Sequence, residues 1–104
     1  MKFTTFLVTN RNDGTPVSAQ ERAEILKSAW QKFGGYTLSG PQLGAWVDDA
    51  GNLYAEESER LEIVCDRSRL QEALDWVKEV GRKVGQKAMY FEVRDYDGVQ
   101  IVNV

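Results

Sequence analysis

The spacing of apolar residues in this 104-residue chain switches between a period of two and a period of about 3.6, and the order of these periods constrains the fold most strongly. Alternation with a period of two predicts four strands, over 2–9, 36–47, 53–65 and 87–94. The helical period predicts two helices, one between Ser18 and Gly34 and one between Asp66 and Gly85. The predicted order is therefore β-α-β-β-α-β within one domain, residues 1–104. This order favours an α+β, ferredoxin-like fold, with an antiparallel sheet and two helices on one face.

Local signals support these boundaries. Ser18 and Glu21 have the spacing of a capping box, and Gly34 supplies the left-handed conformation that ends many helices. Gly40-Pro41 interrupts the second strand, which predicts an edge strand, a bulge or a split strand, because proline has no backbone donor. Asp97-Gly98 predicts a hairpin turn into a short C-terminal strand over 99–102.

Each predicted helix has an apolar stripe that should face the sheet. In the first helix the stripe is Ala23, Leu26, Ala29, Trp30 and Phe33. In the second helix it is Leu70, Ala73, Leu74, Val77, Val80 and Val84. Gly81 lies within the second stripe, where it favours close packing against the sheet, since glycine costs about 1 kcal/mol relative to alanine in a helix.

Both faces of the predicted sheet carry apolar side chains. In the first strand Phe3 and Leu7 alternate with Phe6 and Val8, so one of these pairs points away from the helices. Tyr90, or else its two neighbours, must do the same in the last strand. A sheet that is apolar on both faces is usually covered on both faces. We therefore expect a homo-oligomer, most simply a two-fold homodimer.

Composition excludes several classes of function. The chain has no histidine and one cysteine, Cys65, which removes Ser-His and Cys-His nucleophile pairs and zinc sites built from Cys and His. No phosphate-binding glycine motif is present, and we predict neither a cofactor nor a metal. A net charge of −3 disfavours nucleic-acid and anionic-membrane partners. The absence of a signal peptide and of a long apolar run predicts a bacterial-type cytoplasmic location.

Acidic residues concentrate in the predicted hairpin. Seven carboxylates between Asp48 and Asp66 accompany a single base, Arg60. Trp46 lies beside them and is either a partly exposed binding anchor or a residue that closes one end of the core. The carboxylates themselves are either an interaction surface or a solvated strand edge that blocks aggregation. Cys65 shares the stripe of Leu61 and Ile63, which indicates a buried thiol more than a reactive one.

Residues 44–61 also carry a motif. Their spacing, G-x-W-x-D-x-x-G-x4-E-x-S-x-x-L, resembles that of a family of short bacterial proteins known as a domain of unknown function. The likeness covers about 18 residues and elsewhere extends only to the order of elements. The family brings no assigned chemistry. The resemblance implies that Trp46, Asp48, Glu56 and Ser58 act as a unit, which either fixes the turn or lines a site.

Two functions follow from these patterns. The first is a non-enzymatic, oligomeric interaction module that presents the acidic hairpin to a protein or a small cationic ligand. The alternative is a cofactor-independent enzyme of the dimeric α+β barrel type, with an apolar substrate in a pocket between sheet and helices. The candidate binding residues are Trp46, Asp48, Glu56, Ser58 and Tyr90, and no catalytic residue is assigned.

Overall fold

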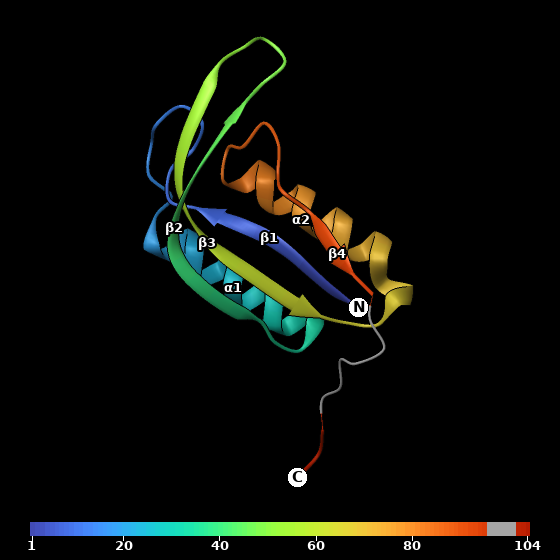
Figure 1. Ribbon diagram of the computed structural model, residues 1–104. Coiled ribbons are helices and arrows are strands. Elements are labelled where there is room, and N and C mark those ends of the chain that lie inside the picture. Colours follow the sequence, from blue (N-terminus) through green and yellow to red (C-terminus); the bar gives the residue numbers. More distant parts are fainter. Residues whose placement is uncertain (96–101) are drawn as a thin grey trace.

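The computed structural model describes residues 1–95 and 102–104 and has an α+β architecture, which confirms the predicted class. In chain order the elements are β1 (Lys2–Val8), α1 (Ala19–Phe33), β2 (Thr37–Val47), β3 (Leu53–Val64), the short 3₁₀ turn η1 (Arg67–Arg69), α2 (Leu70–Lys83) and β4 (Glu92–Arg94). The strands form one four-stranded sheet in the order β2-β3-β1-β4, and every neighbouring pair is antiparallel. Both helices cover the same face, while the β2–β3 hairpin extends beyond the body of the domain (Figure 1).

The helix ends form largely as their sequences predict. The Ser18 hydroxyl accepts a hydrogen bond of 3.0 Å from the Glu21 backbone, and the Glu21 carboxylate accepts one of 3.1 Å from the Ser18 backbone. Gly34 ends α1 with a φ of 92°. Before α2, the Asp66 side chain caps η1 by accepting 2.9 Å from the Ser68 backbone, so the 3₁₀ turn begins the helical segment.

The buried stripe of α1 differs from the prediction. Ile25, Ala29 and Phe33 are buried at i, i+4 spacing, whereas Ala23 and Trp30 are exposed. Two apolar stripes overlap on this helix and share Ala29 and Phe33. The stripe that is buried contains Ile25 in place of Ala23 and Trp30. In α2 the predicted stripe is largely confirmed, with Trp76 added to it.

The core lies between the sheet and the two helices and is dominated by aromatic rings. Phe3 is completely buried at its centre, 5.3 Å from Phe33, 6.3 Å from Trp76 and 5.6 Å from Phe91 between ring centroids. The Trp76 indole also donates a hydrogen bond of 3.1 Å to the Ser28 hydroxyl and thereby links the helices. These rings fill the space between sheet and helices.

The last strand is shorter than predicted. β4 covers only Glu92–Arg94, whereas the alternating pattern predicts a strand over 87–94. Residues 85–91 instead form an irregular segment that Gly85 begins at a φ of 59°. Its backbone is held by a side chain, since the Lys87 N–H donates a hydrogen bond of 2.6 Å to Asn12 Oδ1. The predicted turn at Asp97-Gly98 and residues 99–101 of the tail strand lie outside the described residues.

Gly81 is packed closely, but not against the sheet as expected. A Cβ built on Gly81 would lie 2.6 Å from Cγ of Met89, which belongs to the irregular segment. The glycine therefore makes room for the chain that leaves α2 and returns to the sheet edge.

The helix-free face of the sheet is chemically divided. At one end Lys2, Glu62, Arg60, Glu92 and Arg94 form a chain of ion pairs. At the other end the side chains are mainly apolar and aromatic and line a pocket. Because these charged side chains lie over the sheet and pair with one another, this part of the helix-free face is polar. Homodimer formation through this face stays a prediction.

No helix in the described part of the chain is both long enough and apolar enough to cross a membrane.

A candidate small-molecule site on the helix-free face

A bulge in β2 decides which side chains face the pocket. Ser39 pairs with Arg60, but Gln42 pairs with Ser58, so β2 has one more residue than β3 at Gly40-Pro41. This extra residue reverses the alternation of the strand. Gln42 and Trp46 consequently point to the helix-free face together with Ser58 and Glu56 of β3. The structure bears out two of the alternatives predicted for Gly40-Pro41: β2 is an edge strand of the sheet, and it is bulged at this position.

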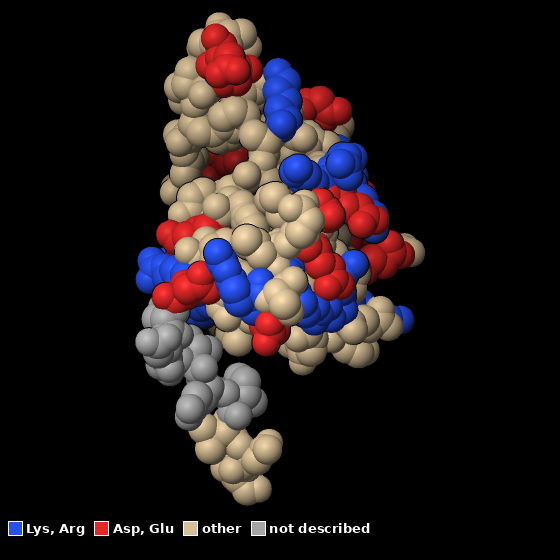
Figure 2. All heavy atoms as spheres, turned by 90° about the vertical axis from the view of Figure 1, so that its right-hand side faces the viewer, with Lys and Arg blue, Asp and Glu red and all other residues tan. Residues whose placement is uncertain are grey.

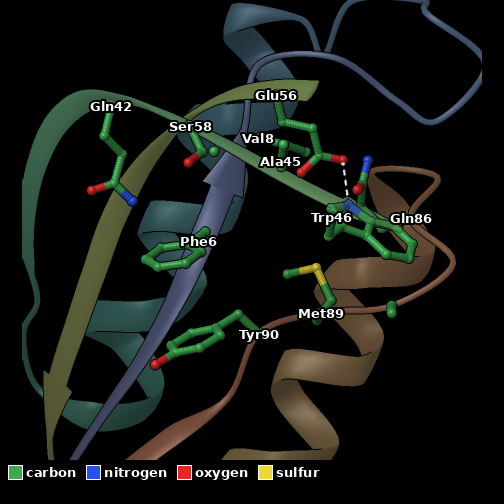
Figure 3. A pocket seen from close by; sticks show the side chains of 12 residues that line it. Phe6, Val8, Gln42, Ala45, Trp46, Glu56, Ser58, Gln86, Met89 and Tyr90 are labelled. Carbon is green, nitrogen blue, oxygen red and sulfur yellow. Dashed lines mark hydrogen bonds between the residues drawn. The ribbon is translucent and has the colours of Figure 1, made fainter. Parts of the chain in front are cut away.

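The resulting cavity, which we term the free-face pocket, has a volume of about 340 Å³. Its walls come from β1, the β2–β3 hairpin and residues 86–90 (Figure 3). This volume is within the range of roughly 300–1,000 Å³ that small-molecule sites occupy. Residues far apart in the sequence therefore converge on one concave, largely apolar surface.

Aromatic rings form two opposite walls of the free-face pocket. Trp46 stacks on Tyr54 with centroids 4.6 Å apart and an interplanar angle of 20°. Phe6 stacks on Tyr90, also at 4.6 Å, with an angle of 10°. Figure 3 shows Phe6 and Tyr90 on one side of the pocket and Trp46 on the other, with Met89 between the Phe6–Tyr90 pair and Trp46. The Tyr90 hydroxyl donates to Glu92 at 3.0 Å, and this hydrogen bond raises the pKa of Tyr90.

Within the part of the chain that the structure describes, Glu56 is the only charged residue that lines the pocket. Its Oε1 accepts a hydrogen bond of 3.2 Å from Nε1 of Trp46 and one of 3.5 Å from Nδ2 of Asn12. Asn12 also donates 3.3 Å to Gln86 Oε1, so it connects the loop after β1 with the segment after α2. Three segments therefore fix the carboxylate in place.

Besides Glu56 and Gln86, the polar side chains of Ser58 and Gln42 reach the free-face pocket. Ser58 is buried and Gln42 is half-buried, and both belong to the lining. Neither side chain has a hydrogen-bond partner among residues 1–95 and 102–104. Their hydroxyl and amide groups are thus available to a ligand, because a polar group in such a place is normally satisfied by some partner.

Asp48, the fifth predicted binding residue, does not line the free-face pocket. Its carboxylate accepts hydrogen bonds from the backbones of Ala50 and Asn52, at 3.0 and 2.9 Å, and from the Asn52 side chain at 3.1 Å. The Asn52 bonds are the main reason why the pKa of Asp48 is lowered to about 2. Lys87 Nζ lies 3.5 Å from the same carboxylate and 2.8 Å from the Tyr54 hydroxyl. Asp48 therefore fixes the turn and ties it to the segment after α2.

The structure brings four of the five predicted residues together: Trp46, Glu56, Ser58 and Tyr90 line one cavity. It adds Phe6, Gln42, Gln86 and Met89, which the sequence analysis does not propose. The interrupted strand at Gly40-Pro41 is the sequence signal for Gln42. Met89 is missed because the alternating pattern assigns it to a strand over 87–94, and Gln86 lies just before that predicted strand, where no motif marks it. Cys65 is half-buried, and burial raises the pKa of its thiol, as the unreactive interpretation requires.

Three of the six carboxylates in the β2–β3 hairpin form ion pairs within the chain. Glu59 pairs with Arg22, Glu62 with Lys2 and Arg60, and Asp48 with Lys87. Figure 2 shows basic and acidic side chains interleaved on the face that contains α2 and β4. Glu57 and Asp49 are exposed carboxylates of the hairpin without such a partner in the described chain. The hairpin therefore presents less unpaired acidic charge than its sequence suggests.

Comparison with known proteins gives a similarity of fold. No protein-family model and no curated protein matches this sequence. Among solved structures, a phage SAM lyase in complex with S-methyl-5'-thioadenosine has a TM-score of 0.68 to this chain. The match covers 90% of this chain and 79% of that chain at 14% sequence identity. This identity establishes a shared fold and no more. The resemblance to the bacterial domain of unknown function stays a prediction.

These findings correct two expectations about function. The main hypothesis, a non-enzymatic module that presents an acidic hairpin, is contradicted: the solved structure of similar fold is a lyase in complex with a small molecule, and three of the six hairpin carboxylates are ion-paired within the chain. The alternative hypothesis, a cofactor-independent enzyme of the dimeric α+β barrel type, expects a pocket between sheet and helices. Phe3, Phe33 and Trp76 fill that space, and the pocket lies on the opposite face of the sheet.

Proposed function

We propose that this chain is a cofactor-independent enzyme that acts on a small organic substrate in the free-face pocket. The observation that carries the proposal is the Glu56 carboxylate, which Trp46 holds at 3.2 Å between aromatic walls. Apolar walls with a few convergent polar groups are the usual form of a small-molecule site. A carboxylate in such surroundings can bind a donor group or accept a proton without a metal or an organic cofactor.

The arrangement of the sheet supports the finer assignment to the ferredoxin-like fold. The order β2-β3-β1-β4, with one helix after β1 and one after β3, is the order that two interlocked β-α-β units give. Many unrelated functions occur on this fold, so the choice of an enzyme rests on the pocket and not on topology.

Association of two copies through the helix-free face fits the same proposal. A second subunit over this face would narrow the open mouth of the pocket and exclude water from it. Static light scattering across a range of concentrations tests the association. A particle with the mass of one chain at every concentration would remove the dimer from the proposal and leave the pocket unaffected.

A thioether nucleoside is the first ligand to test, because the lyase of similar fold is complexed with S-methyl-5'-thioadenosine. Its flat base would stack on the aromatic walls, and its ribose hydroxyls would donate to Glu56. The corresponding substrate, SAM, is a sulfonium cation. When a carbon–sulfur bond of a sulfonium breaks, the electron pair leaves with the sulfur as a neutral thioether. Glu56 would accept a proton from the carbon next to the one that loses sulfur, and the C–H electron pair would form the carbon–carbon double bond of the second product. The step is balanced without a cofactor as an electron acceptor.

The test is incubation of the purified chain with SAM, followed by chromatography for S-methyl-5'-thioadenosine and NMR of the amino-acid product. We expect turnover by the wild-type chain and a loss of about 100-fold or more in Glu56→Gln. Glu57→Gln is the matched control, since Glu57 is the next residue of β3, is exposed and does not line the pocket. A folded wild-type chain that neither consumes SAM nor binds the thioether by calorimetry would refute this substrate class.

A further inference from the structure

Glu56 differs from every other half-buried carboxylate in the described chain, because it has no cationic partner. The others each lie within salt-bridge distance of a Lys or Arg: Glu21, Asp48, Glu59, Glu62, Glu72 and Glu92. The other described carboxylates without an ion pair are exposed to water: Asp13, Glu24, Asp49, Glu57, Asp66 and Asp75. Glu56 is therefore a partly desolvated negative charge whose counterion the described chain does not supply.

The hydrogen bonds of Glu56 do not replace a counterion. Its two donors, the Trp46 indole and the Asn12 amide, are neutral groups, and both bind Oε1. Among the described residues, no Lys or Arg belongs to the lining of the free-face pocket. Two cations of adjacent segments are engaged elsewhere: Lys87 with Asp48 and Tyr54, and Arg11, which lines a second cavity together with Glu56, with Glu21. The second carboxylate oxygen, Oε2, has no partner within the described residues and remains available to a ligand.

The walls of the pocket reinforce this negative potential. Aromatic faces attract cations through the ring quadrupole, most strongly when the cation is removed from water. Trp46 stands on one side of the pocket and the stacked pair of Phe6 and Tyr90 on the other. A carboxylate beside aromatic rings is a combination that favours a cation with an apolar or aromatic body. A charge that is partly out of water gains from such a partner.

We propose that the free-face pocket selects ligands that carry a positive charge next to a flat ring, and that Glu56 is the residue that determines this specificity. The inference rests on the proposed function only for the position of the site. It also has a consequence for turnover. A sulfonium substrate would be held by its charge, and the neutral thioether formed from it would bind less tightly and leave.

A matched pair of small ligands tests the inference without an adenosine group. N-methylquinolinium and quinoline have nearly the same shape, and only the first is charged at neutral pH. Their affinities are measured by calorimetry and by NMR titration of the signals of Ala88 and Met89, which line the pocket. We expect the wild-type chain to bind the cation about tenfold more tightly than the neutral ring.

Glu56→Gln should remove this preference, while its affinity for quinoline changes by no more than about twofold. Glu57→Gln should keep the preference, because its side chain is exposed outside the pocket. Thermal melts of both variants establish that they are folded. Equal affinity of the wild-type chain for the two ligands would overturn the inference, as would a preference that survives in Glu56→Gln or a lack of binding to either ligand.

These outcomes are separate from those of the proposed function. Cation preference without consumption of SAM would retain the specificity of Glu56 and reject the reaction. Consumption of SAM without cation preference would retain the reaction and reject the role of the charge.

Discussion

The Met89 side chain occupies the space in which a side chain on Gly81 would have to lie, with Met89 Cγ 2.6 Å from the position of a Gly81 Cβ. This contact joins the buried side of α2 to one wall of the free-face pocket, because Met89 also lines that pocket. The packing of a helix and the shape of a candidate site therefore depend on one pair of residues.

The first prediction concerns this pair. Gly81→Ala gains about 1 kcal/mol of helix propensity but overpacks Met89, which costs about 1–3 kcal/mol. We expect a net loss of stability in urea denaturation. In a Met89→Ala background the clash is absent, and the same substitution should stabilise the chain by up to about 1 kcal/mol. Stabilisation of equal size in both backgrounds would mean that the two side chains do not compete for space.

A second prediction compares phenylalanines on opposite faces of β1. Phe3 is completely buried in the aromatic core, whereas Phe6 is half-buried beside the pocket. Phe3→Ala should lower the free energy of unfolding by about 3–5 kcal/mol, and Phe6→Ala by clearly less. Phe6→Ala should instead weaken ligand binding, because it removes the ring that supports Tyr90. Similar losses of stability in both variants would contradict the division between core and site.

A third prediction uses tryptophan fluorescence. Trp46 is half-buried at the pocket, Trp30 is 50% exposed on α1, and Trp76 lies in the core. Ligand binding should change the emission of the wild-type chain and of Trp30→Phe, but not that of Trp46→Phe. The Trp46 variant also loses the indole donor to Glu56, which should cost about 1 kcal/mol of stability. A ligand-induced change that persists in Trp46→Phe would place the ligand elsewhere.

The fourth prediction is a pH dependence at the hairpin turn. Hydrogen bonds from Asn52 lower the pKa of Asp48 from 3.8 to about 2 in the folded chain. Folding therefore favours the ionised carboxylate, and this stabilisation is complete above about pH 5 and lost as the pH falls from about 4 towards 2. The difference in melting temperature between wild type and Asp48→Ala should be constant above that window and narrow within it.

Asp49→Ala is the control for this prediction. Asp49 is the exposed neighbour of Asp48 and accepts none of the hydrogen bonds that Asp48 accepts in the turn. Its melting temperature should follow that of the wild type at every pH. A gap between wild type and Asp48→Ala that does not change with pH would show that the turn does not depend on the charge of Asp48.

The parts of the fold that depend on neighbouring residues were predictable from the sequence. The capping box of Ser18 and Glu21 and the order of strands and helices are local signals of this kind. The choice between two overlapping stripes on α1 was not predictable, because Ile25 and Trp30 are both suitable core residues and only packing against the sheet decides between them. The register between neighbouring strands was not predictable for the same reason, because it depends on packing between residues far apart in the sequence.

The candidate site shows the same limit. The motif identifies Trp46 and Glu56, but a single extra residue in β2 at Gly40-Pro41 decides whether Trp46 lies on the same face as Glu56. Met89 was missed because the alternation of residues 87–94 is a good strand pattern. The hydrogen bond between Lys87 and Asn12, 75 residues apart, holds this segment out of the sheet instead. Contacts between residues so far apart in the sequence produce no periodic pattern from which they could be predicted.

One wall of the pocket is built from residues 86–90, a stretch that belongs to no helix and no strand. Apart from Met89, its side chains lie outside the core between sheet and helices: Gln86 bonds to Asn12, Lys87 pairs with Asp48, and Tyr90 stacks on Phe6. Substitutions in this stretch therefore change one wall of the pocket and spare the core, so related chains could diverge in what they recognise while they inherit the same core.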